Sequence, residues 1–341
     1  MKLKRVRLQN ATSSTIAVKS HDRWIPMDQV LSLAGESITE ENNRLSTDMI
    51  AVLQAGQSMR DKWQALADDF DGELPKIENT PLLPFQPRSY RDFMLFEQHV
   101  INASRGYARR FLPMSYKIAA VYEHLFKLTF PKFRPHPLWY KKPIYYMGNH
   151  LNFVTDQHPV AFPSYSRALD YELELGVIIV KHLKNASEKE AMDAIGGFVV
   201  FNDFSARDVQ LPEMRSGFGP VKAKHFINAI SSAVVTADEI MPHLYNLTGE
   251  VRINDQTIVT TSTSDMDYTL GEAIAYASMD EQLYPGEFFG SGTLPGGCGM
   301  ENGCWLAPDD TVELEIEKVG TLVNTITQSP NPDKPEKLKV I

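Results

Sequence analysis

The fold is decided by the stretch Leu169–Val180, which reads LDYELELGVIIV. Its first half alternates apolar and acidic residues and its second half is rich in β-branched residues, so the pattern predicts a β-strand. Successive side chains of a strand point to opposite faces, which places Asp170, Glu172 and Glu174 on one side. Residues two apart on a strand are separated by roughly 7 Å. At that spacing, two carboxylates can reach a single ion between them.

A pair of carboxylates on a strand can also be a solvated face, where like charges repel and raise one pKa. The apolar run Val177–Val180 follows at once and indicates instead a strand that enters a core. A second polar cluster, Asn202–Gln210, reads NDFSARDVQ and comes later in the chain. Mg²⁺ and Ca²⁺ require hard oxygen ligands, which separate strands can supply. The two clusters together predict a divalent metal site.

Composition places the chain among soluble globular proteins. Its 341 residues, 43% hydrophobic and 23% charged, are enough for one large domain with a smaller one attached. The net charge of −9 argues against nucleic acid and acidic membranes as partners. Two cysteines, Cys298 and Cys304, predict a reducing compartment, although a disulfide between them stays open. The basic N-terminus lacks a signal-peptide core and no apolar run could span a membrane, so we expect a cytoplasmic protein.

Two domains are predicted. Residues 1–85 form a small N-terminal α/β domain and linker, with two short strands before residue 20 and apolar residues at helical spacing in Met27–Leu33 and Asn42–Phe70. Ser46 is the predicted N-cap of the second helix. Prolines between residues 75 and 87 mark the linker. Residues 86–341 form the predicted catalytic domain.

The larger domain is predicted to be rich in β-strands. A helical segment is expected to begin within Arg91–His99 and another to run from Pro113 to about Lys127. The aromatic and proline-rich segment Phe130–Gly148 suits an ordered loop over a pocket. Asn254-Asp255 is a predicted two-residue hairpin turn. The charged tail after Ser329 is expected to be frayed.

Five motifs follow one another in a fixed order between Tyr90 and Val319. An Asp lies seven residues before a His, and then come DYELELG, NDFSARDVQ, GPVKAK and SGT. In this order the motifs resemble those of the fumarylacetoacetate hydrolase family. The resemblance implies a β-rich α+β fold, in which a mixed β-roll carries a divalent metal at its open end, and a homodimer.

The resemblance also implies the metal ligands. They fall on Asp92, Glu172, Glu174 and Asp203, and the ion is expected to be Mg²⁺, with Ca²⁺ or Mn²⁺ as alternatives. Four carboxylates around one cation also make sense on their own, because uncompensated like charges are costly to bury. Asp92 has a second interpretation, as an N-cap of the helix expected to start beside it.

Arg207 and Gln210 match the substrate-binding pair of the family. An arginine fork suits a carboxylate, and a glutamine amide can donate to a keto or enolate oxygen. Lys224 matches the lysine that stabilises negative charge developing on the substrate. The chain departs from the family at residues 227–228, where Ile-Asn stands in place of a common Gly-Thr.

His99 matches the general base of the hydrolases in this family, because a neutral imidazole can take a proton from water. A carboxylate is expected to orient it. We assign this role to Glu301, which requires a shorter loop after the SGT motif, with Glu97 as the alternative. Tyr146 and Thr293 align with further substrate contacts.

These assignments predict a metal-dependent hydrolase that cleaves a carbon–carbon bond in a β-diketo acid or acylpyruvate through a metal-bound enolate, with His99 activating water. The alternative is an isomerase or decarboxylase of 2-keto or 2-hydroxydienoic diacids, because such reactions can use an enolate on the same site. A third hypothesis, a non-catalytic carboxylate-binding protein, is opposed by the joint presence of all the site residues. The predicted partners are a small keto-acid and a second copy of the chain, with a role in aromatic compound catabolism.

Overall fold

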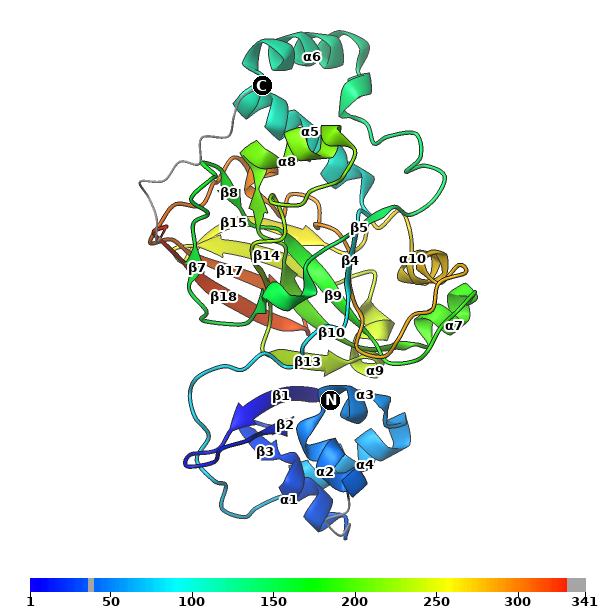
Figure 1. Ribbon diagram of the computed structural model, residues 1–341, viewed down its shortest axis with the longest axis vertical. Coiled ribbons are helices and arrows are strands. Elements are labelled where there is room, and N and C mark those ends of the chain that lie inside the picture. The colour runs from blue at the N-terminus through cyan, green and yellow to red at the C-terminus, as the bar shows by residue number, and fades with distance from the viewer. Residues whose placement is uncertain (36–39, 330–341) are drawn as a thin grey trace.

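The computed structural model describes residues 1–35 and 40–329. Figure 1 shows an elongated molecule with the N-terminal region at one end, helices α5 (Glu97–Phe111) and α6 (Pro113–Phe126) at the other, and the sheets between them. The architecture is a sheet-rich α+β fold, as predicted. Within the described residues, no helix combines the length and the apolar character that crossing a membrane requires.

A large mixed sheet forms the centre of the molecule. Its middle strand β9 (Leu173–Ile179) pairs antiparallel with β10 (Ile195–Asn202) on one side and with β16 (Phe288–Gly290) on the other. β16 then pairs in parallel with β4 (Tyr90–Phe93). The outer strands of this sheet are β5 (Tyr145–Met147) beyond β4, and β13 (Ala233–Thr236), β1 (Lys2–Arg7), β2 (Ser14–Ser20) and β3 (Arg23–Pro26) beyond β10, with β12 (Asn228–Ile230) and β6 (Phe153–Val154) as a side branch.

The predicted strand Leu169–Val180 is present but interrupted. Its first two residues form β8 (Leu169–Asp170), which pairs with β11 (Ser205–Ala206) rather than with β10. The long strand β9 begins only at Leu173. Between the two, Glu172 makes an isolated bridge to Cys298. The backbone therefore joins the central sheet only from Leu173 onward. Glu172, a predicted metal ligand, lies within the break between β8 and β9.

A second sheet packs against one face of the first. Its strand order is β15 (Gln256–Ser262), β14 (Thr248–Ile253), β17 (Thr311–Ile316), β18 (Gly320–Thr327) and β7 (Val160–Ala161). Leu175, Val177 and Ile179 of β9 point into the core that this sheet shares. The turn between β14 and β15 has a positive φ at both Asn254 (50°) and Asp255 (64°), which confirms the predicted hairpin turn.

The N-terminal helices cover the opposite face of the central sheet. They are α1 (Met27–Leu33), α2 (Glu40–Thr47), α3 (Met49–Gln54) and α4 (Gln57–Asp68). Trp63 of α4 and Met49 of α3 share a core cluster with Ile178 of β9. The alternation along β9 therefore serves two cores, one on each face.

The structure corrects the predicted N-cap in this region. The helical run expected over Asn42–Phe70 is three helices, and Ser46 lies inside α2. Asp48 is the N-cap of α3, because the chain turns there and its carboxylate accepts hydrogen bonds from the N–H groups of Ile50 and Ala51.

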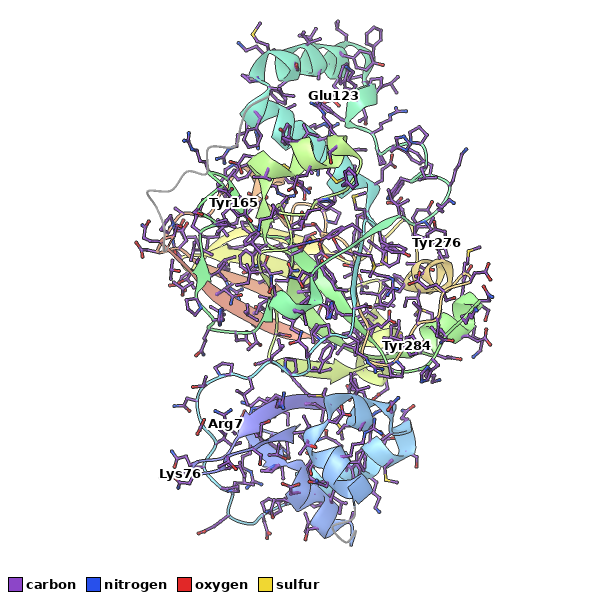
Figure 2. All side chains as sticks on the ribbon, in the orientation of Figure 1. Arg7, Lys76, Glu123, Tyr165, Tyr276 and Tyr284 are labelled. Carbon is purple, nitrogen blue, oxygen red and sulfur yellow. The ribbon has the colours of Figure 1, made fainter. Side chains whose placement is uncertain are left out.

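The N-terminal region is joined to the central sheet. β1 pairs antiparallel with β13, so the first strands extend that sheet. The chain after α4 returns along β1, where the Gln9 N–H donates to the Lys76 carbonyl and the Glu78 N–H to the Arg7 carbonyl, and Figure 2 shows Arg7 and Lys76 on the same side of this region. The division into domains at residue 85 stays a prediction.

The structure also corrects the start of the first helix in the larger domain. The segment expected to be helical over Arg91–His99 begins as the strand β4, and α5 starts only at Glu97. Pairing with β16 and β5 on both sides fixes this backbone as a strand. The N-cap interpretation of Asp92 is therefore wrong.

The remaining helices include the one predicted after Pro113. α6 lies where it was predicted, and Ser187 is the N-cap of α7 (Glu188–Met192). The others are α8 (Arg207–Ser216), α9 (Ala237–Ile240), α10 (Leu270–Ala277), α11 (Gly299–Asn302) and the 3₁₀ turns η1 (Pro131–Phe133), η2 (His150–Asn152) and η3 (Met241–His243). The predicted frayed tail after Ser329 lies outside the described residues.

Candidate active site

A cavity of about 310 Å³ opens where α5 and α8 cover the end of the central sheet. Nine of the eleven predicted site residues line it: Asp92, His99, Tyr146, Glu172, Glu174, Arg207, Gln210, Lys224 and Thr293. The other two lie directly behind this lining. Asp203 accepts a hydrogen bond from Lys224, and Glu301 contacts His99. The fold thus brings together the complete set that the sequence proposed.

Three of the predicted metal ligands form a compact cluster. Carboxylate oxygens of Asp92 in β4, Glu174 in β9 and Asp203 just after β10 lie within 4.8 Å of one another, and all three residues are buried. Glu172, the fourth predicted ligand, bonds to two positively charged side chains instead. It accepts a hydrogen bond from the Arg207 guanidinium at 2.6 Å and another from Lys224. The cluster itself can supply three oxygen ligands, with Glu172 at its edge.

The cluster fits a divalent cation. Asp92 Oδ1 and Glu174 Oε1 are buried without a hydrogen-bond partner. Burial and neighbouring carboxylates raise the pKa of both groups well above its ordinary value. A Cβ at Gly290 would lie 2.3 Å from Asp92 Oδ1 and 2.7 Å from Glu174 Oε2, so only glycine leaves this space open. Hard oxygen donors around such a space suit Mg²⁺, Mn²⁺ or Ca²⁺.

Lys224 is a buried cation on the floor of the cavity. Its Nζ donates to Asp203 Oδ2 at 2.5 Å and to Glu172. Although burial opposes it, the charges of Asp203 and Glu172 hold the pKa of Lys224 above its ordinary value. Burial raises the pKa of Asp203 to about 6, even though Lys224 acts in the opposite direction. Lys224 therefore stays protonated at neutral pH and offers a positive charge to the cavity.

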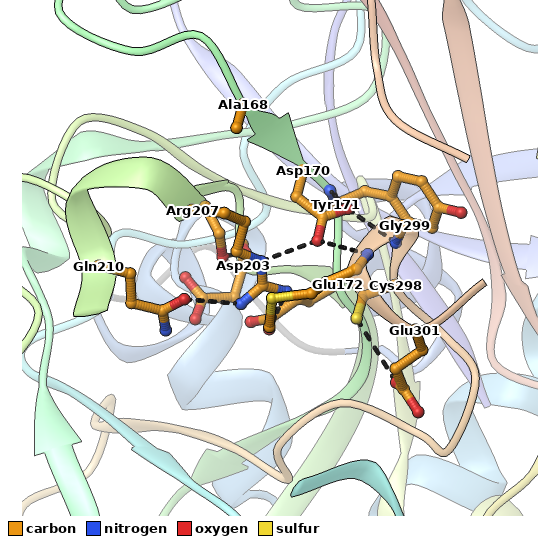
Figure 3. A network of polar contacts seen from close by, with 12 residues as sticks. Ala168, Asp170, Tyr171, Glu172, Asp203, Arg207, Gln210, Cys298, Gly299 and Glu301 are labelled. Atoms are coloured by element: carbon orange, nitrogen blue, oxygen red, sulfur yellow. Dashed lines mark hydrogen bonds and ion pairs between the residues drawn. The ribbon is translucent and has the colours of Figure 1, made fainter. Parts of the chain in front are cut away.

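Arg207 is held by a network that the sequence only partly revealed. Its Nε donates to Asp170 Oδ2 at 2.7 Å, and a terminal nitrogen donates to Gln210 Oε1 at 2.9 Å (Figure 3). Asp170 is fully buried and also accepts hydrogen bonds from the N–H groups of Gly299 and Met300. Sequence reasoning placed Asp170 on the carboxylate face but gave it no role. The sequence signal was a third acidic residue on the alternating face, two positions before Glu172.

His99 and Glu301 form a hydrogen-bonded pair beside this network. His99 Nδ1 lies 2.7 Å from Glu301 Oε1, and the Gly296 N–H donates to Glu301 Oε2 at 2.8 Å. The Cys298 thiol also points to Glu301, as Figure 3 shows. The alternative partner, Glu97, instead accepts a hydrogen bond from the Tyr140 hydroxyl. The geometry favours Glu301 as the residue that orients His99.

A glycine allows the two helices that carry this pair to approach each other. Gly106 lies in the middle of α5, and a Cβ at this position would lie 1.7 Å from the Met300 carbonyl oxygen of α11. A real Cβ atom essentially never comes within 3.0 Å of another non-bonded heavy atom. Because His99 is on α5 and Glu301 is on α11, this contact sets how closely the imidazole and the carboxylate can approach.

Tyrosine side chains complete the back of the cluster. The Tyr146 hydroxyl donates to Asp203 Oδ2 at 2.6 Å and lies 3.0 Å from the Tyr90 hydroxyl. Burial raises the pKa of Tyr146 well above its ordinary value, so it remains a donor. Asn228, at the departure from the family pattern, lies with its amide 2.9 Å from Asp203 Oδ1. The sequence gave no indication that Tyr90 or Asn228 would support Asp203.

Fold and site together define a class of enzyme in which a mixed β-roll carries a buried carboxylate cluster suited to a metal, with a histidine–glutamate pair beside it. The family described as fumarylacetoacetate (FAA) hydrolase C-terminal matches residues 117–327. The chain belongs to the fumarylacetoacetate hydrolase family. Asp92 and His99 precede the matched region, and the structure brings both of them to the cavity.

Known proteins resemble this chain in sequence and in fold. A mitochondrial oxaloacetate tautomerase of Xenopus laevis is 32% identical over 188 residues, which are 54% of this chain and 58% of that protein, so the match spans less than two thirds of the relative. A fumarylacetoacetate hydrolase from Exiguobacterium antarcticum has a TM-score of 0.65 and 18% identity, covering 96% of this chain and 99% of that one. A fumarylpyruvate hydrolase from Pseudomonas aeruginosa, solved with Mn²⁺ and pyruvate, has a TM-score of 0.54 and 18% identity, covering 74% and 100%. At these identities the two structures support the fold.

Proposed function

We propose that the protein is a metal-dependent hydrolase that cleaves a carbon–carbon bond in an acylpyruvate or a related β-diketo acid. The observation that carries this proposal is the His99–Glu301 pair, with 2.7 Å between Nδ1 and Oε1. In this pair, His99 lines the same cavity as Asp92 and Glu174 of the carboxylate cluster. Hydrolysis needs a base for water close to an activated carbonyl: the pair would supply the base, and an ion held by the cluster would supply the activation.

Asp92, Glu174 and Asp203 would hold the ion, with Glu172 at the edge of the cluster. A bound Mg²⁺ or Mn²⁺ supplies Lewis-acid stabilisation of negative charge on substrate oxygens. The Mn²⁺ and pyruvate named for the Pseudomonas aeruginosa hydrolase support a metal of this kind and a keto-acid product.

His99 acts on water. Because Nδ1 is engaged with Glu301, Nε2 is the nitrogen left to accept a proton from a water molecule in the cavity. The carboxylate of Glu301 fixes the tautomer and stabilises the imidazolium that forms. The resulting hydroxide attacks the distal carbonyl of the substrate, and the bond between the acyl carbon and the neighbouring carbon breaks.

Lys224, Arg207 and Gln210 act on the keto-acid part of the substrate. The Lys224 ammonium, buried at the floor of the cavity, offsets negative charge on the departing fragment. Because the Gln210 oxygen already accepts from Arg207, its amide nitrogen is the atom that would donate to a substrate oxygen. Protonation of the departing fragment then gives pyruvate, and the other product is the carboxylic acid of the acyl group.

Tautomerisation is the second candidate function. The Xenopus laevis relative is named an oxaloacetate tautomerase, and a keto–enol exchange needs proton transfer without addition of water. Isomerisation and decarboxylation of diacids share this requirement. These reactions would use the same cluster, so the ligands do not separate them from hydrolysis. The homodimer and the cytoplasmic location remain predictions.

The test is an ultraviolet assay of purified protein with Mg²⁺ or Mn²⁺ on acylpyruvates, fumarylpyruvate and oxaloacetate, with His99→Ala in parallel. The proposal expects loss of diketone absorbance, formation of pyruvate and a second acid, and loss of both in the variant. Exchange between keto and enol oxaloacetate without any cleavage product, at a rate that His99→Ala leaves unchanged, would contradict hydrolysis and support the tautomerase.

A further inference from the structure

The cavity has two chemically different parts. Its floor carries the carboxylates, Arg207 and Lys224. Its outer wall is lined by side chains of α5, α8 and α11 that are mostly apolar or aromatic, with the Ser104 hydroxyl among them: Val100, Ala103, Tyr107, Leu211, Met214 and Met300. Figure 1 shows α5 and α8 lying next to each other above the sheets. A substrate whose keto-acid end lies on the floor must extend its other end along this wall.

The outer wall offers no charge for a second carboxylate. Among the described residues that line the cavity, the arginine and lysine side chains are Arg207 and Lys224, both on the floor. Each is already paired with carboxylates: Arg207 with Asp170 and Glu172, and Lys224 with Glu172 and Asp203. An anionic tail would therefore lie against a mostly apolar wall without a cationic partner, which is costly in free energy.

Two cations lie in an adjoining cavity. Lys132 and Arg215 line a second space of about 520 Å³, which shares Ser104, Tyr107 and Leu211 with the first. A carboxylate could reach them only by passing the apolar wall. Arg215 is exposed, so water already solvates its guanidinium group. These cations therefore define the competing hypothesis, a long diacid that spans both cavities.

We infer that the outer wall is an acyl-binding subsite for apolar groups, so that the preferred substrates are acylpyruvates with an aliphatic or aromatic acyl chain rather than diacids. This inference rests on the proposed function for the reaction, but the subsite itself binds by shape and polarity. Burial of one methylene group contributes about 0.8 kcal/mol. Each methylene added within the subsite is therefore expected to raise affinity about three- to fourfold.

Binding of 2-oxo acids that carry no second keto group tests the subsite without any turnover. Calorimetry with Mn²⁺-loaded protein would compare 2-oxobutanoate, 2-oxohexanoate and 2-oxoadipate. Affinity should rise from the first to the second, and 2-oxohexanoate should bind about tenfold tighter than 2-oxoadipate, which has the same chain length but ends in a carboxylate. Equal or tighter binding of 2-oxoadipate would overturn the inference.

Variants of Met214 test whether the outer wall causes the preference for apolar 2-oxo acids. Met214 is 47% exposed, so Met214→Arg is expected to fold, and it places a cation on the outer wall. It should reverse the preference toward 2-oxoadipate, whereas Met214→Gln, which adds no charge, should not. Met279→Arg is the matched control, because Met279 is 64% exposed and does not line the cavity. No change of preference in Met214→Arg would contradict the subsite.

Arg215→Gln distinguishes the competing hypothesis. If 2-oxoadipate bound tightly to the wild type and lost affinity in this variant, the substrate would be a diacid that reaches the adjoining cavity, and the inference would be wrong. Failure of the proposed function has a different result: apolar 2-oxo acids would still bind preferentially, while no acylpyruvate of any chain length would be cleaved.

Discussion

His99 Nδ1 and Glu301 Oε1 lie 2.7 Å apart, although 202 positions separate the two residues in the chain. One is on α5 and the other on α11, and the carboxylate is fixed from behind by the Gly296 N–H. A histidine becomes an effective base when a second group fixes its tautomer and orientation. The contact thus joins the long helix α5 to the short helix α11, which comes much later in the chain.

Glu301→Gln should lower kcat for acylpyruvate cleavage by about a hundredfold, because a positioned base contributes roughly 10²–10⁴-fold. KM should change little, since Glu301 does not line the cavity. Steady-state kinetics at saturating Mg²⁺ measure both. Glu97→Gln is the control: Glu97 bonds to Tyr140, so its removal should leave kcat unchanged. Equal losses in both variants would show that Glu301 does not act through His99.

Gly106→Ala should destabilise the protein even though alanine favours helices. A Cβ at residue 106 would lie 1.7 Å from the Met300 carbonyl, and forcing extra atoms into a packed contact costs about 1–3 kcal/mol. Urea denaturation should show this loss, together with a lower kcat because α5 and α11 separate. Gly56→Ala is the control, since no atom lies within 4 Å of its Cβ position. Gly56 is the N-cap of α4, where alanine is less favourable than glycine, so some stability is lost there too, but kcat should stay unchanged.

Asp203→Asn should abolish metal-dependent turnover and weaken Mn²⁺ binding at least about tenfold, because it removes one of three clustered carboxylates. The amide keeps the size of the side chain, so the fold should survive, as circular dichroism can check. Asp208→Asn is the control within the same motif: Asp208 accepts hydrogen bonds from Ser166 and Arg167 and does not line the cavity. Full metal-dependent turnover in Asp203→Asn would remove this residue from the metal site.

The stability of the metal-free protein should fall as the pH rises. Burial raises the pKa of Asp92 and Glu174 well above its ordinary value and that of Asp203 to about 6. Carboxyl groups of this kind bind protons more tightly in the folded protein than in the unfolded chain. Their contribution to the free energy of unfolding is complete below about pH 4, the pKa of these groups in the unfolded chain. It is lost as the pH rises through their pKa in the folded protein.

Thermal melts in EDTA should therefore give a lower Tm at pH 8 than at pH 5.5. Added Mg²⁺ replaces the protons, so its gain in Tm should be larger at pH 8. Glu172 affects stability with the opposite sign, because Arg207 and Lys224 lower its pKa despite its burial. Its stabilising contribution is lost only as the pH falls below about 4, which is outside the range of these melts. A gain in Tm that does not depend on pH would contradict the assignment of these carboxylates to the metal.

Much of the fold and the site could be predicted because the relevant information is local. The alternation in Leu169–Val180 predicts a strand with its carboxylates on one side, and the structure has Glu172 and Glu174 on the same cavity. The hairpin turn at Asn254-Asp255 depends on two residues that tolerate positive φ. The order of the motifs predicted the family, which the family match confirms.

Local patterns failed where distant segments compete for the same backbone. The residues around Asp92 read as the start of a helix, but β16 and β5 pair with them on both sides and make them a strand. Ser46 and Asp48 are both acceptable caps in sequence, and the turn between α2 and α3 selects Asp48. Propensity is a weak preference that tertiary hydrogen bonding overrides.

The sequence by itself determined which candidate site residues the chain offers, because the type and spacing of side chains along a strand or helix are written in the chain. The tertiary structure decided which of them meet. Asp170 holds Arg207 and the start of α11 through hydrogen bonds from far along the chain, and Gly106 matters only because Met300 packs against it. Such contacts depend on how the sheets and helices pack, which no local pattern encodes.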